Sequence, residues 1–310
     1  MREDAAVLAD LAERISARDH PSWSESRDEL HEQLSHSWVD PSRDGVLCLD
    51  VDSRPIAYGL VSQPPDPESL VRLFVSGGVD PLHRGRGIGH RMLTWQHTRA
   101  RQLLRGSSHT LPAWVMTHAA DLAPEHGVLL LRHGFEVARY FTTLECAVPA
   151  SAANPVTPRG VSVERYQSQW SEEVRQAKNS AFADHWGSQP IGQEQWRSME
   201  ALPSFRPELS RVALDGNRVV GFVMTEINKD DWVKQGYSSG YIGLVGTVSD
   251  WRRRGLATAL LGEVLEAYRE AGLDRAVLDV DTESPTGALG LYTALGFSPT
   301  TRDAAYRVTY

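Results

Sequence analysis

The chain has 310 residues, of which 41% are hydrophobic and 23% charged, and a formal net charge of −8. This length predicts two domains, and the composition is typical of a folded protein. Because the net charge is negative, the chain gains little affinity from neutralising phosphates, which argues against a nucleic-acid partner. The sequence has neither a run of roughly 18 to 20 apolar residues nor an apolar leader. We therefore expect a cytoplasmic protein that does not enter a membrane.

The first half of the chain opens on an amphipathic pattern that predicts a helix over Ala5–Ile15, with no strand before it. An apolar segment ending at Val79 predicts a strand. A basic, glycine-rich stretch follows it, Arg84-Gly85-Arg86-Gly87-Ile88-Gly89. Apolar residues at helical spacing then predict a helix, a short apolar run at Trp114–Met116 predicts a strand, and a further helix closes on the pair Gly134-Phe135.

The same features recur in the second half in the same order. The second basic loop is Arg252-Arg253-Arg254-Gly255-Leu256-Ala257-Thr258, a strand is predicted over Ala276–Leu278, and the last helix closes on Gly296-Phe297. The glycine loops lie 168 positions apart, from residue 87 to residue 255, and the Gly-Phe pairs 162 apart, from residue 134 to residue 296. Features that recur in one order at nearly one offset indicate a tandem repeat.

A segment rich in proline, glycine and small residues over 147–160 separates the two copies and predicts a linker. We place the first domain at 1–148, the linker at 149–160 and the second domain at 161–310. The second domain opens with an alternating strand over Val161–Tyr166 and a helix over Glu172–Phe182, and further strands are predicted at Val219–Glu226 and Tyr241–Val248.

Each basic loop joins a predicted strand to a predicted helix, and this position suits a pyrophosphate. The first N–H groups of a helix have no intrahelical partner, and the helix dipole favours anions at that end. Glycine lets the backbone approach a phosphate, and the arginines at Arg84, Arg86 and 252–254 add positive charge. The loops match neither a Walker loop nor the three-glycine dinucleotide fingerprint.

On these residues the chain resembles the GNAT acetyltransferase superfamily. The signature Gln/Arg-x-x-Gly-x-Gly/Ala is matched from Arg84 to Gly89 and from Arg252 to Ala257. A tyrosine four residues before a Gly-Phe pair is matched by Leu291-Tyr292-Thr293-Ala294-Leu295-Gly296-Phe297. The tandem arrangement is similar to the mycothiol synthases and related two-domain acetyltransferases of actinobacteria.

The resemblance implies an α/β fold of the α+β type: two tandem domains, each a mixed, largely antiparallel sheet flanked by helices. The fourth and fifth strands of each sheet are expected to part and admit acetyl-CoA as the acyl donor, with no metal. The implied donor contacts in the second half are Val245, Gly246, Thr247, the loop residues 252–258 and Ser284. In the first half they are Gly77, Gly78, Val79 and the loop residues 84–89.

Two local structures are also expected near these contacts. The aligned glycines Gly78 and Gly246 suggest a β-bulge where the backbone passes close to the ligand. Ser284-Pro285 predicts an N-cap and first helical position for the helix that carries Tyr292.

The implied reaction is direct attack of an amine on the acetyl thioester, which needs a base for the amine and an acid for the departing sulfur. Tyr292 is the candidate acid. The corresponding position in the first half holds Leu130, which cannot donate a proton. We therefore expect the second domain to catalyse, and the first to bind acetyl-CoA without turnover or to have lost its function.

The base is less well marked in the sequence. The mycothiol synthases have a glutamate early on the fourth strand, where this chain has Tyr241. Tyr241 and Glu226, on the preceding strand, are our catalytic candidates beside Tyr292, and a base acting through water is a further possibility. Three other side chains stay open as candidates, namely His185, Asp279 and Asp281.

We expect the acceptor to be a small-molecule amine, because aromatic residues gather in the predicted acceptor region. These residues are Phe182, Trp186, Trp196, Phe205 and Trp232. The alternatives are a mycothiol synthase-like activity, acetylation of protein lysines, and a non-catalytic acetyl-CoA-binding module. A tandem fusion favours a monomer, with a homodimer as the alternative.

Overall fold

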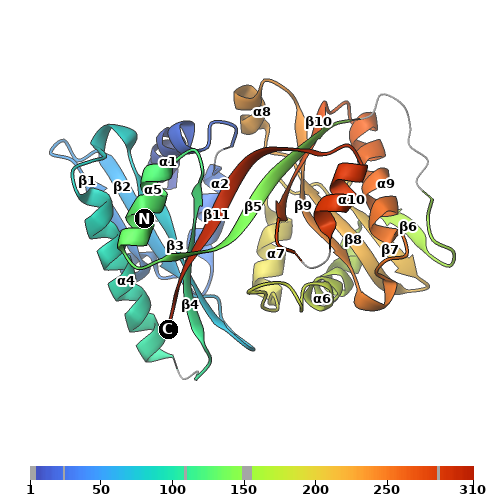
Figure 1. Ribbon diagram of the computed structural model, residues 1–310, viewed down its shortest axis with the longest axis horizontal. Coiled ribbons are helices and arrows are strands. Elements are labelled where there is room, and N and C mark those ends of the chain that lie inside the picture. Colours follow the sequence, from blue (N-terminus) through green and yellow to red (C-terminus); the bar gives the residue numbers. More distant parts are fainter. Residues whose placement is uncertain (1–4, 24, 108–109, 149–155, 285–286) are drawn as a thin grey trace. The chain divides into compact units, whose positions relative to one another are not determined.

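The computed structural model describes residues 5–23, 25–107, 110–148, 156–284 and 287–310. The chain forms two compact units, one of residues 1–140 with 302–310 and the other of residues 141–301 (Figure 1). Residues 149–155 of the expected linker lie outside the described residues. None of the described helices is both long and apolar enough to cross a membrane.

The first unit combines helices with a mixed sheet. Its helices are α1 (Ala5–Asp19), α2 (Arg27–Ser35), α3 (Pro41–Asp44), α4 (Ile88–Gly106) and α5 (Pro124–Arg132), with a 3-10 turn at Pro81–His83. Its strands are β1 (Gly45–Leu49), β2 (Pro55–Ser62), β3 (Val71–Val79), β4 (Ala113–Ala120), the beginning of β5 (Glu136–Ala147) and the end of β11 (Ser298–Thr309).

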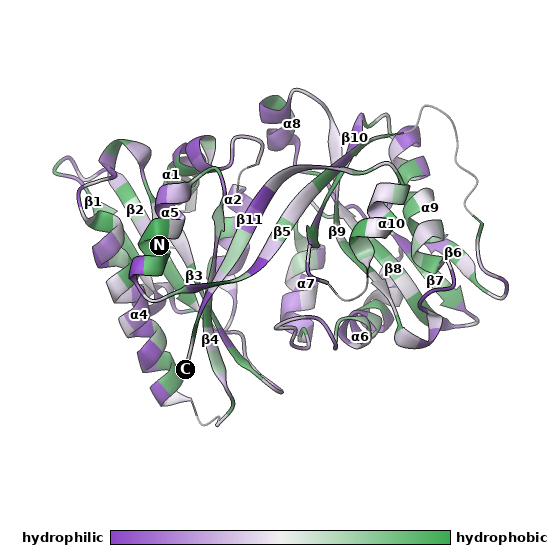
Figure 2. Cartoon of the chain, viewed as in Figure 1, coloured by the Kyte–Doolittle hydropathy of each residue, from purple (hydrophilic) through white to green (hydrophobic). Residues whose placement is uncertain are grey.

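The sheet of the first unit has the order β1-β2-β3-β4-β11, and only β3 and β4 run parallel. Their pairing extends from Val71 opposite Ala113 to Phe74 opposite Met116, after which the strands part. Helix α4 packs on β2 and β3 through a face that includes Met92. Figure 2 shows hydrophobic and hydrophilic residues interleaved along α4, as a helix with one buried face requires.

The second unit is built in the same way. Its strands are the end of β5, β6 (Ser162–Arg165), β7 (Arg211–Asp215), β8 (Arg218–Glu226), β9 (Ser239–Thr247), β10 (Arg275–Asp281) and the beginning of β11. Its helices are α6 (Ser171–Ala181), α7 (Gln193–Ala201), α8 (Lys229–Gln235), α9 (Leu256–Glu270) and α10 (Ala288–Ala294), with 3-10 turns at Ser168–Trp170 and Ser249–Trp251.

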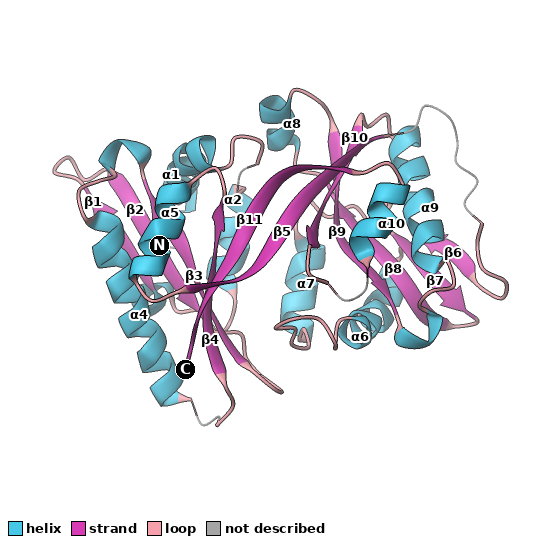
Figure 3. Cartoon of the chain, viewed as in Figure 1, coloured by secondary structure: helices cyan, strands magenta, loops and turns pink. Residues whose placement is uncertain are grey.

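The sheet of the second unit has the order β5-β10-β9-β8-β7-β6 (Figure 3). Strands β9 and β10 are its parallel pair, and their register runs only from Ser239 opposite Arg275 to Tyr241 opposite Val277. Helices α6 and α9 both pack on β8 and β9. The fully buried side chains of Phe222 and Tyr268 belong to the resulting core. The expected fold class is confirmed in both units.

The last strand of each repeat completes the sheet of the other repeat. Residues Phe141–Ala147 of β5 pair with β10 in the second unit, whereas Asp303–Thr309 of β11 pair with β4 in the first. The expected boundaries at 148 and 161 therefore do not follow the two compact units. A strand has the same alternation of side chains whichever sheet it joins, so the sequence gives no sign of this exchange.

Two local expectations were wrong. Gly246 pairs in regular register with Phe222, and the register around Gly78 is unbroken, so neither glycine forms a bulge. The irregularity in β9 lies at Gly243, where the register shifts between Met224 and Thr225 of β8. Helix α10 begins at Ala288 with Gly287 as its N-cap, and not at Ser284. Pro285 lies outside the described residues.

Candidate functional site

A cavity of about 810 Å³ opens in the second unit where β9 and β10 part. Side chains of β9 and β10, the loop before α9, the end of α6 and the helix α10 line it. The pairing of the two strands ends at Tyr241 and Val277, and beyond these residues the strands are apart. Backbone groups of β9 beyond Tyr241 that face the gap therefore lack a β10 partner and are available to a ligand.

The loop before α9 presents free backbone N–H groups to this cavity. Gly255 caps the helix in the left-handed conformation, with φ 79°, and the first bond of the helix runs from the N–H of Ala259 to the carbonyl of Gly255. The N–H groups of residues 256–258 precede that bond, and the helix dipole adds to their attraction for an anion. This arrangement is suited to a pyrophosphate.

The two basic loops share an unusual backbone. Arg253 and Gly255 have φ values of 58° and 79°, and the matching residues Gly85 and Gly87 have 74° and 78°. A non-glycine residue such as Arg253 pays roughly 1–3 kcal/mol for a sparsely populated conformation of this kind. The loop shape is thus repeated in the second unit even at a position without glycine.

The signature arginines hold the loops in place. In the second unit, Arg252 donates to both carboxylate oxygens of Asp184, at 2.6 and 3.0 Å, and to the carbonyl of Ala181 at 2.7 Å. The hydrogen bonds from Arg252 hold the pKa of Asp184 below its usual range. In the first unit, Arg84 makes the same kind of pair with Asp19, at 2.8 and 2.7 Å. Both arginines also line the cavities of their units, so their expected contact with a pyrophosphate stays a prediction.

The other two arginines of the second loop differ in their surroundings. Arg254 stacks over the Trp251 ring at 4.7 Å and lies outside the cavity lining. Arg253 is exposed, lines the cavity, and has no ion-pair partner among the described residues. Arg253 is therefore the cation best placed to meet a phosphate.

Strand β9 supplies a polar atom that lacks a partner. Val245, Gly246 and Thr247 all line the cavity. The Thr247 hydroxyl is buried and makes no hydrogen bond to the described residues. Buried polar groups are rarely left unsatisfied, which marks Thr247 as a position where a ligand fits. Gly246 faces the Phe222 ring so closely that a Cβ would overlap it.

Tyr292 stands in the wall of the same cavity. It lies on α10, is 7% exposed, and packs edge-on against Phe297. Burial raises the pKa of Tyr292 to about 12. The phenol is therefore protonated at neutral pH and is able to donate a proton.

A second group of polar side chains lies where the strands begin to part. Asp279 accepts a hydrogen bond from the Tyr241 hydroxyl at 2.9 Å on one oxygen and from the Thr143 hydroxyl at 2.6 Å on the other. Asp279, Tyr241 and Asp281 line the cavity. Both carboxylate oxygens of Asp279 are thus engaged by residues of β5 and β9.

The remaining base candidates occupy different positions. Glu226 pairs with Tyr241 across β8 and β9, and its Oε1 lies 2.9 Å from the place a Gly243 Cβ would take, yet Glu226 does not line the cavity. His185 does line it, beside Phe182, and burial lowers the pKa of the His185 imidazole. His185 follows Asp184, and the Asp281 carboxylate of β10 also acts on its imidazole.

The expected aromatic acceptor region is only partly present. Phe182 lines the cavity, but Trp186, Trp196, Phe205 and Trp232 do not. Trp196 and Trp232 instead donate their indole N–H groups to Ser171 and to the carbonyl of Ser239. Phe141 of β5 also lines the cavity, although it was not among the residues predicted from the sequence. It belongs to the first repeat, so only knowledge of the strand exchange could have placed it.

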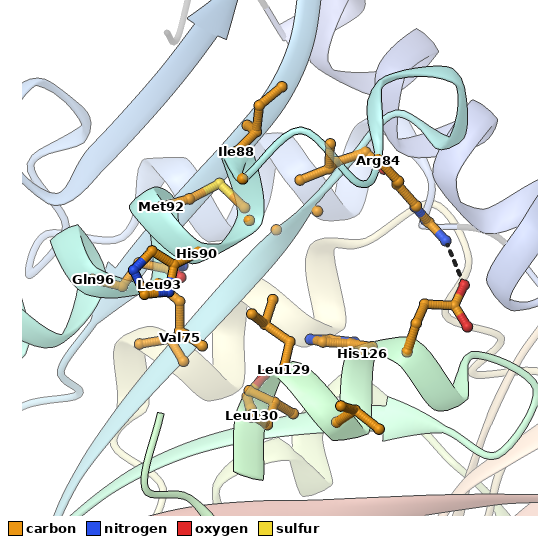
Figure 4. Close-up of a pocket in the computed structure, with 18 of the residues that line it drawn as sticks. Val75, Arg84, Ile88, His90, Met92, Leu93, Gln96, His126, Leu129 and Leu130 are labelled. Atoms are coloured by element: carbon orange, nitrogen blue, oxygen red, sulfur yellow. Dashed lines mark hydrogen bonds and ion pairs between the residues drawn. The ribbon is translucent and has the colours of Figure 1, made fainter. Parts of the chain in front are cut away.

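The first unit has a corresponding cavity of about 540 Å³ (Figure 4). Gly77, Gly78, Val79 and most of the first loop line it, although Arg86 does not. Figure 4 shows apolar side chains, among them Met92 and Leu129, around the space. Leu130, which is 1% exposed, takes the place that Tyr292 has in the second unit.

Comparison with known proteins agrees with this geometry. Residues 171–297 match the acetyltransferase (GNAT) family. The mycothiol acetyltransferase of Thermobispora bispora is 32% identical over 253 residues, which cover 81% of this chain and 78% of the relative. The chain belongs to the GNAT acetyltransferase family. This acetyltransferase is thus an acyl-CoA-dependent N-acyltransferase.

Other relatives match nearly the whole chain. The mycothiol acetyltransferase of Thermobifida fusca is 28% identical over 314 residues, covering 97% of this acetyltransferase and 93% of the relative. A GCN5-related N-acetyltransferase from Sphaerobacter thermophilus has a TM-score of 0.73 at 24% identity, with 100% and 93% of the chains covered. A tandem GNAT protein from the clavulanic acid biosynthesis pathway has a TM-score of 0.66 at 16% identity, with 99% and 95% covered. These two structures share the tandem fold.

Proposed function

We propose that this acetyltransferase transfers the acetyl group of acetyl-CoA to a primary amine of a small molecule, and that the reaction takes place in the second unit. The observation that carries the proposal is Tyr292, a protonated phenol in the wall of the cavity between the parted strands. The corresponding position of the first unit holds Leu130, whose side chain cannot donate a proton. A positioned general acid contributes typically about 10²- to 10⁴-fold in rate.

The residues of the second unit fit acetyl-CoA. The N–H groups that begin α9, together with Arg253, are suited to the pyrophosphate. The unpaired edge of β9 and the Thr247 hydroxyl offer hydrogen bonds to the amide groups of the pantetheine arm. Ser284 lies across the cavity on the segment before α10.

In this proposal the amine attacks the thioester carbonyl directly. A backbone N–H near Gly246 or Thr247 stabilises the negative charge that develops on the carbonyl oxygen. Tyr292 donates its proton to the sulfur as the carbon–sulfur bond breaks.

The relatives support a particular acceptor. Several are named mycothiol acetyltransferase, and those of Thermobispora bispora and Thermobifida fusca cover 81% and 97% of this chain. We therefore propose the acceptor of those enzymes as the first amine to test. The position at which mycothiol synthases have a glutamate holds Tyr241 here, which leaves a different small amine as the competing acceptor.

The first unit has a loop of the same shape, with Leu130 at the position of Tyr292. We propose that it binds acetyl-CoA without turning it over, supported by the matching φ values at Gly85 and Gly87 and by the cavity beside them. Equilibrium binding to the full chain is then expected to show two acetyl-CoA sites. A stoichiometry of one, lost on Arg253→Glu, would show that the first unit does not bind.

The test of the proposed function is a free-thiol release screen with purified protein, acetyl-CoA and a panel of amines that includes the mycothiol-type acceptor, aminoglycosides and lysine peptides. The proposal predicts thiol release with at least one small amine and mass-spectrometric detection of the acetylated product. Release with lysine peptides alone would replace the small-molecule acceptor with a protein. Acetyl-CoA binding without release for any amine would contradict the proposal.

A further inference from the structure

The cavity of the second unit contains a polar chain that the reaction described above does not use. Val277 is the last residue of β10 that pairs with β9, and its partner there is Tyr241. Asp279 comes two residues later, on the same face of β10. Tyr241 and Asp279 therefore lie at the fork where the two strands part. The chain runs from the Tyr241 hydroxyl to Asp279, whose other oxygen accepts from Thr143.

We propose that Tyr241 and Asp279 act together as the general base for the acceptor amine, with Thr143 as the residue that positions Asp279. In this pair the phenolic oxygen of Tyr241 contacts the amine, and the Asp279 carboxylate receives the proton through the phenol. The inference rests on the proposed function, because it concerns the same cavity and the same reaction.

The geometry joins the carboxylate to the phenol. Thr143 and Tyr241 each donate to one oxygen of Asp279, at 2.6 and 2.9 Å. These two bonds orient the carboxylate, so a proton that reaches the Tyr241 oxygen has an acceptor one hydrogen bond away. Because Tyr241 donates its proton to Asp279, the lone pairs of its oxygen are the part that accepts a proton from the amine.

The proton transfers balance without a further reactant. The nitrogen lone pair forms a bond to the acetyl carbon, and a nitrogen proton passes to the Tyr241 oxygen while the Tyr241 proton passes to Asp279. The carbon–sulfur bond breaks, and the sulfur takes the proton of Tyr292. Asp279 is exposed and returns its proton to solvent, from which Tyr292 regains one. An acceptor that arrives as an ammonium ion first loses one additional proton to solvent.

The other candidates fit this role less well. Glu226 lies on β8 beside Gly243 and does not line the cavity. His185 lines the cavity near Asp184, the partner of the loop residue Arg252, and near Asp281, and burial lowers the pKa of its imidazole. Asp281 lines the cavity farther along β10 and accepts the backbone N–H of Glu283.

The relay is tested by substitution at both members of the pair, with the amine that gives the highest turnover in wild-type protein. Tyr241→Phe and Asp279→Asn are each expected to lower kcat by about 10²-fold, the range of a general base, with the KM for acetyl-CoA unchanged. The double variant is expected to fall no further than the single variants, because both remove one relay. The acid limb of the kcat–pH profile is expected to change in all three.

A substitution that places a carboxylate directly at the amine gives the sharper result. Tyr241→Glu is expected to turn over faster than Tyr241→Phe. It is expected to keep this turnover when it is combined with Asp279→Asn, because the glutamate accepts the proton directly and the relay is no longer needed. Thr143→Val is expected to lower kcat several-fold and Thr143→Ser to restore it, since serine retains the hydroxyl. Thermal melting and acetyl-CoA affinity confirm that each variant is folded.

The matched control is Tyr237→Phe. Tyr237 donates a hydrogen bond to the Glu145 carboxylate, so the two form a second tyrosine–carboxylate pair, and burial together with this bond raises the pKa of Tyr237. Tyr237 does not line the cavity. Its turnover is expected to equal that of wild-type protein. Wild-type kcat and an unchanged pH profile in Tyr241→Phe would overturn the relay and leave the proposed function intact. Absence of turnover in the wild-type protein with every amine would overturn both.

Discussion

Leu130 and Tyr292 each stand four residues before the Gly-Phe pair of their repeat, and each lines the cavity of its own unit. Both side chains are buried, at 1% and 7% exposure. The cavities share parted parallel strands and a loop of alternating left-handed residues. The two repeats therefore keep the same loop and strand arrangement and differ at the position of the candidate proton donor.

The loop of the second unit gives the first prediction. We expect Asp184→Asn to weaken acetyl-CoA binding several-fold, because Asp184 fixes Arg252, which in turn donates to Ala181 and to the strand end at Thr247. Calorimetric titration with acetyl-CoA measures the effect. Simple charge removal predicts the opposite sign, since losing an anion near the phosphates frees Arg252. Tighter binding in Asp184→Asn would therefore show that Arg252 is a phosphate ligand.

The glycines of the second unit give a prediction about stability. Gly246→Ala is expected to lower the free energy of unfolding by about 1–3 kcal/mol, because its Cβ would overlap the buried Phe222 ring. Gly290→Ala is the matched control on α10, where no atom lies within 4 Å of the added Cβ. That change is expected to stabilise by about 0.5–1 kcal/mol. Urea denaturation measures the free energy of unfolding of both variants. Equal stabilities of the two variants would contradict the close packing at Gly246.

The pH dependence of turnover follows from the protonation of Tyr292. A general acid works only while it holds its proton, and burial raises the pKa of Tyr292 to about 12. We therefore expect kcat to show no alkaline fall from this residue up to about pH 10, where an ordinary tyrosine is already half ionised. The check is a kcat–pH profile in wild-type and Tyr292→Phe protein. An alkaline limb near neutral pH that vanishes only in the variant would be incompatible with this assignment.

Much of the fold was predictable because local patterns repeat. The loops at 84–89 and 252–257 and the Gly-Phe pairs revealed two copies, and glycine and helix-start signals depend on neighbours in the chain. The exchange of β5 and β11 was not predictable, because strand pairing is a long-range choice that leaves no local mark. The start of α10 was also missed, since Gly287 takes the left-handed cap position in place of Ser284.

The candidate site was predictable to a similar degree. The strand segment Val245–Thr247 and Tyr292 were implied by the resemblance to the GNAT superfamily, and both line the cavity. The partners of the arginines could not, since Asp184 is far from Arg252 in the sequence and near it only in the folded chain. The chain from Thr143 through Asp279 to Tyr241 joins three strands, so no single segment of sequence shows it.

The central claim is that chemistry takes place in the second unit through Tyr292. Its most direct test is thiol release by Tyr292→Phe beside acetyl-CoA affinity, with Tyr237→Phe as the control outside the cavity. We predict a fall in kcat of about 10²- to 10⁴-fold with acetyl-CoA affinity within a factor of two. Turnover in Tyr292→Phe equal to that of the wild-type protein would contradict the account.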